Sequence, residues 1–137
     1  MANFRNRAVF ATLAAYWSAL LVATSLPQSA APELVFSDKL VHFGAYAGLS
    51  ALLSLALAYQ RKWRRLATSP LAWAAAIAIL YGAFDELHQA FIPGRSCEFL
   101  DLVADALGAG VGAAIGAALL RLKFFRTDGE HFRDPSV

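Results

Sequence analysis

Four long runs of apolar residues divide the chain, and each is long enough to cross a membrane as an α-helix. They cover residues 8–26, 40–59, 70–91 and 100–120. A spanning helix needs roughly 20 predominantly apolar residues, at a rise of about 1.5 Å per residue. Pro27 closes the first run, Ser69-Pro70 is typical of a helix start, and Pro93-Gly94 ends the third. The pattern predicts an all-α bundle of four transmembrane helices.

Composition supports the same class of protein. Of the 137 residues, 58% are hydrophobic and only 16% are charged, whereas soluble domains carry about 25% charged residues. The length predicts a single domain over residues 1–137. The lone Cys97 excludes an intramolecular disulfide and a CxxC metal or redox motif. No basic tail with interleaved aromatic residues is present, so we expect no nucleic-acid partner.

The basic residues predict the orientation. If four helices alternate, all but Lys39 and Arg95 of the 12 basic residues fall on one side of the membrane. Those on the common side are Arg5, Arg7, Arg61, Lys62, Arg64, Arg65, Arg121, Lys123, Arg126 and Arg133. The positive-inside rule therefore predicts that both termini and the middle loop are cytoplasmic.

The first run has a second interpretation. Arg5 and Arg7, the apolar run and the small residues Ala23-Thr24-Ser25 also match the plan of a signal peptide. A run of about 19 apolar residues is long for the apolar region of a signal peptide. We therefore favour a retained helix, and both alternatives place the following loop outside.

Acidic residues gather at the opposite, outer side. They are Glu33, Asp38, Asp85, Glu86, Glu98, Asp101 and Asp105. Asp85 lies about 22 Å along its helix from Pro70, roughly two turns below the outer end. Ionisable side chains at membrane depth are costly, and they mark a functional site by default. The outer ends of the helices are therefore the place to look for chemistry.

Helical spacing predicts that these side chains meet. Asp38 and His42 are four residues apart, as are Asp85 and Gln89, and Asp101 and Asp105, so the members of each pair share a face. The Asp105 face continues through Gly108, Gly112 and Gly116, and small residues at this spacing allow helices to approach closely; Gly44 and Gly48 are expected to do the same. We expect one polar pocket, with the Pro93-Gly94-Arg95 turn as its lid.

The charge balance of this pocket is negative. Seven acidic residues face two fixed cations, Lys39 and Arg95, together with His42 and His88. A partly buried cluster cannot remain that negative without a free-energy cost. Either some carboxylates are protonated, or the site takes up a cation or a cationic ligand.

Two motifs resemble the VanZ-like family of small bacterial membrane proteins. The first is Asp38-Lys39-Leu-Val-His42-Phe43-Gly-Ala-Tyr46. The second is Asp85-Glu86-Leu-His-Gln89-Ala-Phe-Ile-Pro93-Gly94-Arg95, followed by Asp101 and by Asp105, where many members carry asparagine. The resemblance covers the last three helices. It implies a multi-pass protein of the bacterial inner membrane with a site on the outer face. The family is named for a protein that gives low-level teicoplanin resistance, which implies a link to glycopeptide susceptibility.

Three hypotheses follow for the site. The first is binding of an anionic amphiphile, such as a lipid or glycan-lipid head group. Lys39 and Arg95 would hold the anion, and the remaining ligand-binding candidates are Asp38, His42, Tyr46, Asp85, Glu86, Gln89, Asp101 and Asp105. In this site Asp38 would fix the tautomer of His42, and Asp101 would cap its helix or pair with Arg95.

The second hypothesis is hydrolysis or group transfer on such a lipid. Glu86 or His42 would then act as general base beside Asp85. A divalent ion held by Asp85, Glu86, Asp101 and His42 would fit this chemistry, but the spacing matches no defined metal motif and identifies no cofactor. The third hypothesis is structural, with the polar residues only holding the helices together. The sequence leaves these three, and the oligomeric state, open.

Overall fold

The computed structural model of the protein describes residues 2–30, 37–60 and 62–131, and in these ranges it contains helices and no strand. Glu33, Arg61 and Arg133 lie outside the described residues. The elements are α1 (Ala2–Ser25), the 3-10 helix η1 (Gln28–Ala30), α2 (Asp38–Tyr59), α3 (Arg64–Thr68), α4 (Pro70–Gln89) and α5 (Phe99–His131).

Four of these helices are long and apolar enough to cross a membrane, which confirms the predicted multi-pass architecture. The membrane-length segments are Asn6–Ser25, Asp38–Tyr59, Pro70–Gln89 and Phe99–Leu122. Pro70 starts α4 as its first residue, as the sequence predicts. Two features go beyond the prediction: the short helix α3 lies in the basic middle loop, and α5 continues past residue 120 to His131.

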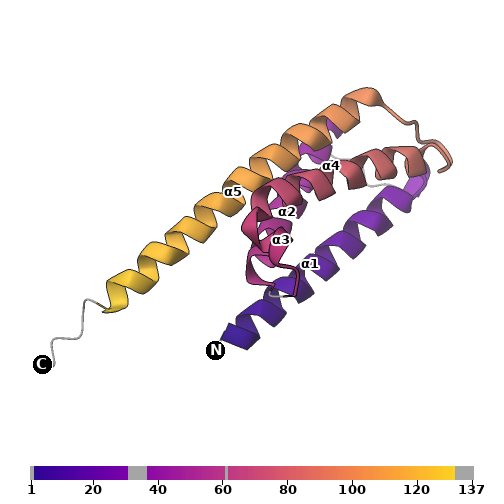
Figure 1. The fold of residues 1–137 in the computed structure, drawn as a ribbon. Coiled ribbons are helices and arrows are strands. Elements are labelled where there is room, and N and C mark those ends of the chain that lie inside the picture. Colours follow the sequence, from indigo (N-terminus) through magenta and orange to yellow (C-terminus); the bar gives the residue numbers. More distant parts are fainter. Residues whose placement is uncertain (1, 31–36, 61, 132–137) are drawn as a thin grey trace, which may run out of the picture.

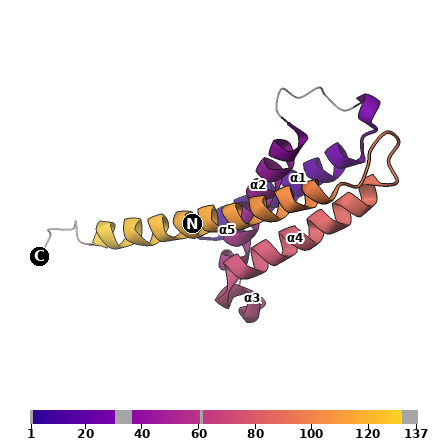
Figure 2. The ribbon, with the colours of Figure 1, turned by 90° about the horizontal axis from the view of Figure 1, so that it is seen from above.

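Three helices form the centre of the bundle. Helix α2 packs most extensively against α5, and α4 contacts both of them. Helix α1 lies against α2 and α4, and within the described residues it does not touch α5. The N-terminal end of α1 and the C-terminal half of α5 lie at the same end of the bundle (Figure 1), and Figure 2 shows α1 and α4 ending together at the other. This agrees with four alternating spans; which side is cytoplasmic stays a prediction.

Glycines bring α5 close to α2, as their spacing predicts. A Cβ atom at Gly108 would collide with the backbone carbonyl of Phe43, and one at Gly112 with that of Ala47. A Cβ atom at Gly116 would lie 2.5 Å from Cβ of Ser54. Backbones at this separation leave no room for lipid or for larger side chains. The helices therefore meet along a dry seam of small residues.

On α2, the close packing predicted for Gly44 and Gly48 is found only at Gly48. A Cβ atom at Gly48 would collide with the hydroxyl of Tyr16, so α1 packs closely there. The Tyr16 hydroxyl also donates a hydrogen bond to the carbonyl oxygen of Ala45, at 3.0 Å. At Gly44 a Cβ atom would meet nothing within 4 Å. The prediction of close packing is wrong for Gly44, because that side of the helix faces away from its neighbours in this chain.

A buried acidic cluster at one end of the bundle

Five ionisable side chains from three helices lie buried together where α2 and α5 begin and α4 ends. We call them the acidic cluster: His42 of α2, Asp85 and Glu86 of α4, and Asp101 and Asp105 of α5. Their exposed fractions run from 0% at Asp105 to 7% at His42. The prediction that polar residues of separate helices converge is confirmed. They form a closely packed cluster with little exposed surface.

His42 is the centre of the cluster. Its Nδ1 atom lies 3.0 Å from Oδ1 of Asp105 and 3.7 Å from Oε1 of Glu86. The first distance is a hydrogen bond and the second is too long for one. The other Glu86 oxygen, Oε2, accepts a hydrogen bond from the backbone N–H of Glu98 at 2.9 Å. This bond fixes the Glu86 carboxylate with Oε1 on the His42 side.

Asp85 has its own partners. Its Oδ2 atom accepts hydrogen bonds from the Tyr46 hydroxyl at 3.1 Å and from Nε2 of Gln89 at 3.3 Å. Gly82, one turn before Glu86, makes room for this arrangement. A Cβ atom there would lie 2.9 Å from Oδ2 of Asp105 and 3.2 Å from the Tyr46 ring. Because Gly82 has no side chain, Asp105 of α5 and Tyr46 of α2 can approach α4 closely at this point.

Arg95 lies at the edge of the cluster and faces α1. Its Nε atom donates to the carbonyl oxygen of Leu26 at 3.1 Å, and a terminal nitrogen lies 3.4 Å from that of Ala23. A cation is favourable beside the unpaired carbonyls at a helix C-terminus. The other terminal nitrogen donates to Oε1 of Gln89 at 2.9 Å. Arg95 thus ties the end of α1 to the residue that holds Asp85.

Lys39 bridges two carboxylates at the start of α5. Its Nζ atom lies 2.8 Å from Oδ1 of Asp101 and 2.9 Å from Oε2 of Glu98. The hydrogen bond from Lys39 lowers the pKa of the Glu98 carboxyl below its usual value. Asp101 therefore pairs with Lys39, and of the two roles that the sequence left open for it, the pairing with Arg95 is not the one observed.

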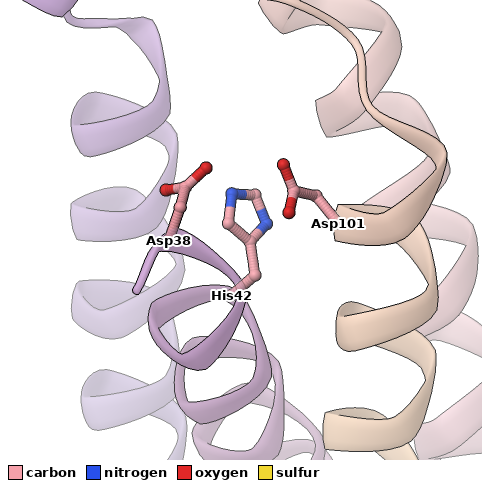
Figure 3. A group of neighbouring side chains, drawn as sticks. All are labelled: Asp38, His42 and Asp101. Carbon is pink, nitrogen blue, oxygen red and sulfur yellow. The ribbon is translucent and has the colours of Figure 1, made fainter. Parts of the chain in front are cut away.

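Asp38 lies on the other side of the His42 ring, as Figure 3 shows with Asp101 opposite. Asp38, His42 and Asp101 each offer a donor atom, and these atoms lie within 4.8 Å of one another. Asp38 is exposed, in contrast to the acidic cluster. The hydrogen-bonded partner of His42 is Asp105. The prediction that Asp38 orients the His42 imidazole is therefore wrong. The spacing within α2 does not show that Asp105 of α5 lies at hydrogen-bonding distance.

Several buried oxygens of the cluster have no hydrogen-bond donor among the described residues. They are Oδ1 of Asp85, Oε1 of Glu86 and Oδ2 of Asp105. A buried polar atom without a partner normally costs about 1–3 kcal/mol, and more if it is charged. The acidic cluster is therefore a place where the fold accepts a cost in stability.

The family of the chain follows from its sequence and agrees with this geometry. A model of the family described as VanZ/LLP1 matches residues 1–121. The chain belongs to the VanZ/LLP1 family. No curated protein and no solved structure matches it. The match to the VanZ/LLP1 model includes the first three membrane-length helices, the fourth up to residue 121, and the whole acidic cluster, and it confirms the resemblance seen in the two motifs.

Two contributions to the site were missed by reasoning from the sequence. The sequence places Glu98 only among the acidic residues of the outer side, yet its backbone N–H orients Glu86. Gly82 has no charge or motif position to mark it, although its missing side chain accommodates Asp105. His88, a neighbour of these residues on α4, stacks on Phe84 with ring centroids 6.4 Å apart. The contacts of Glu98 and Gly82 join separate segments of the chain, so no pattern within one helix reveals them.

Proposed function

We propose that this VanZ/LLP1 protein binds the phosphate-bearing head group of an envelope lipid at the acidic cluster, with the aid of a cation. The observation that carries the proposal is the burial of four carboxylates, three of which have an oxygen without a donor. Among the described residues, only Lys39 and His42 offer positive charge in contact with them. A ligand that brings positive charge would complete this site.

The charge of the cluster changes the first hypothesis in one respect. Lys39 is engaged by Asp101 and Glu98, and Arg95 by backbone carbonyls and Gln89. An anionic head group that approached four carboxylates unaided would be repelled. A cation between head group and carboxylates would remove that repulsion, and Arg95 at the edge of the cluster could then contact the phosphate. The anionic amphiphile therefore remains our ligand, with the cation as an added requirement.

The structural hypothesis is less well supported. Removing charges from water costs several kcal/mol per ion unless each charge is well paired. Apolar residues of similar volume would join three helices at least as well. Oxygens without donors, as at Glu86 and Asp105, hold nothing together. We infer that the carboxylates are present for binding rather than for stability.

Catalysis is the second candidate, and one feature favours it. Glu86 is buried with a free oxygen 3.7 Å from the His42 ring. A carboxylate in this setting can act as general base if a water reaches it. Hydrolysis of the bound lipid would then require the same cluster, and turnover of a phosphate ester would separate catalysis from binding.

A thermal-unfolding experiment tests the binding proposal. The purified protein in detergent would be mixed with phosphatidylglycerol, or with phosphatidylcholine as the zwitterionic control, in the presence of Mg²⁺, Ca²⁺ and Zn²⁺. A ligand at about 100 times its Kd stabilises a protein by about 2.7 kcal/mol. We expect phosphatidylglycerol to raise the melting temperature, and Arg95→Ala to weaken the effect. Equal melting temperatures in both lipids would contradict the proposal.

The orientation has a separate test. Cys97 is the single thiol of the chain and is exposed in the turn before α5. We propose that this turn is extracytoplasmic, in a bacterial inner membrane. A membrane-impermeant maleimide should then label Cys97 in intact spheroplasts. Labelling only after permeabilisation would place the acidic cluster on the cytoplasmic side.

A link to glycopeptide susceptibility would appear as a raised teicoplanin tolerance in an expressing host, lost with Glu86→Gln.

A further inference from the structure

Two sets of side chains around His42 have the composition of a metal site. One consists of Asp38, His42 and Asp101, and the other of His42, Glu86 and Asp105. In each set the donor atoms lie within 4.8 Å of one another. An acidic cluster alone is weak evidence for a metal, because carboxylates often gather without one. The two sets differ in how their oxygens are used.

The first set is already satisfied or open to water. Asp101 accepts a hydrogen bond from the Lys39 ammonium at 2.8 Å, so a cation is in place. Asp38 is exposed. Neither carboxylate needs a further positive charge.

The second set is buried and incomplete. Glu86 is 3% exposed and Asp105 is 0% exposed. Oε1 of Glu86 and Oδ2 of Asp105 have no donor among the described residues. The bond from the Glu98 amide to Oε2 leaves Oε1 beside Nδ1 of His42. Two carboxylates and a neutral imidazole carry a charge that one divalent ion would balance.

The separations agree with coordination. In a tetrahedral site with bonds of about 2.1 Å, neighbouring ligand atoms are about 3.4 Å apart. The observed distances from His42 Nδ1, 3.0 Å to Oδ1 of Asp105 and 3.7 Å to Oε1 of Glu86, lie on either side of that value, so Oδ1 would bind the ion in place of its hydrogen bond to His42. Each ligand comes from a different helix, so the bundle itself holds them in place.

We propose that His42, Glu86 and Asp105 bind one divalent transition-metal ion, for which Zn²⁺ is the probe. The ion would bind Nδ1 of His42 in the neutral form of the imidazole, so a proton held between Nδ1 and Asp105 would be released to solvent. Asp38 and Asp101 flank the ring, where a carboxylate can orient a metal-bound imidazole (Figure 3). Three protein ligands leave one position open. The role of that position, to receive a head-group oxygen, rests on the proposed function; the metal site itself does not.

Calorimetric titration of the full chain with Zn²⁺ tests the site directly. The detergent-solubilised protein, first freed of metal with a chelator, would be titrated without added lipid. We expect one ion per chain. Glu86→Gln and Asp105→Asn should each weaken binding by at least about 100-fold, since even outer-shell changes cost 10–100-fold. Glu98→Gln is the matched control, the same chemical change at an exposed carboxylate, and should leave affinity within about two-fold.

Two results of the titration would overturn the proposal. One is the absence of stoichiometric Zn²⁺ binding. The other is binding that survives Glu86→Gln but is lost with Asp101→Asn, which would place the ion in the first set. X-ray absorption of the Zn²⁺-loaded natural protein is a further test that does not depend on the folding of any variant. We expect one imidazole with oxygen ligands at about 2.0–2.2 Å; a sulfur shell at about 2.3 Å would place the ion on Cys97 and refute the site.

The lipid experiment and the metal experiment fail independently. Zn²⁺ binding without any phosphatidylglycerol effect would leave the metal site standing and remove the proposed function. A phosphatidylglycerol effect that requires Mg²⁺ or Ca²⁺, with no stoichiometric Zn²⁺ binding, would leave the proposed function standing and remove the metal site.

Discussion

The interface between α2 and α5 has two halves of opposite chemistry. Along the middle of the bundle, Gly108, Gly112 and Gly116 lie against the backbone and small side chains of α2. At the end where both helices begin, His42 meets Asp105 and Lys39 meets Asp101. The glycine half is closely packed, whereas the acidic half contains carboxylate oxygens that have no hydrogen-bond donor among the described residues. We infer that the close packing of the glycine half offsets the loss of stability that the acidic cluster causes.

The glycine half should give the largest effect when changed. Gly112→Leu would drive a side chain into the backbone of Ala47, and overpacking of this kind costs about 3 kcal/mol. We expect a strongly lowered melting temperature or loss of folded protein. Gly110→Leu is the matched control, because a Cβ atom at Gly110 meets nothing within 4 Å. Equal melting temperatures for the two variants would show that the close approach of α5 to α2 is not needed.

The connection to α1 should give a smaller effect. Arg95→Ala removes the hydrogen bonds to the carbonyls of Leu26 and Ala23 and to Gln89. Because hydrogen bonds of a charged donor contribute about 1.5–3 kcal/mol when buried, we expect a loss of about 1–2 kcal/mol at this half-buried site. Thermal unfolding and the protease sensitivity of α1 would measure it. Arg95→Lys should restore part of the loss, and an alanine variant as stable as the natural chain would refute this role.

The regions that these two variants change also differ in how well the sequence predicts them. The spans were predictable because membrane length and apolar composition constrain them strongly. The gathering of polar residues at one end of the bundle was predictable, because a four-residue spacing places each polar pair on one face of its helix. The contacts of Arg95 were not, since they depend on where the end of α1 lies, and α1 has no polar stripe to orient it. Helix α3 was missed because five residues carry too little periodicity.

The smallest effect is expected at the edge of the acidic cluster. Glu98→Gln removes a carboxylate that pairs with Lys39, but both side chains are well exposed, and exposed ion pairs contribute little. The backbone N–H that holds Glu86 remains. We expect no measurable change in melting temperature. A clear drop would mean that the Glu98 carboxylate helps to hold the cluster together.

The central claim is that the buried carboxylates serve binding at the expense of stability. The most direct test is the melting temperature of Glu86→Gln, measured alone and with phosphatidylglycerol and divalent ions. Alone, the variant should melt at or above the temperature of the natural chain, since one of four buried carboxylates has lost its charge. With lipid and ions, it should lose the stabilisation that the natural chain gains. A variant that melts lower alone and responds to the ligands like the natural chain would contradict the account.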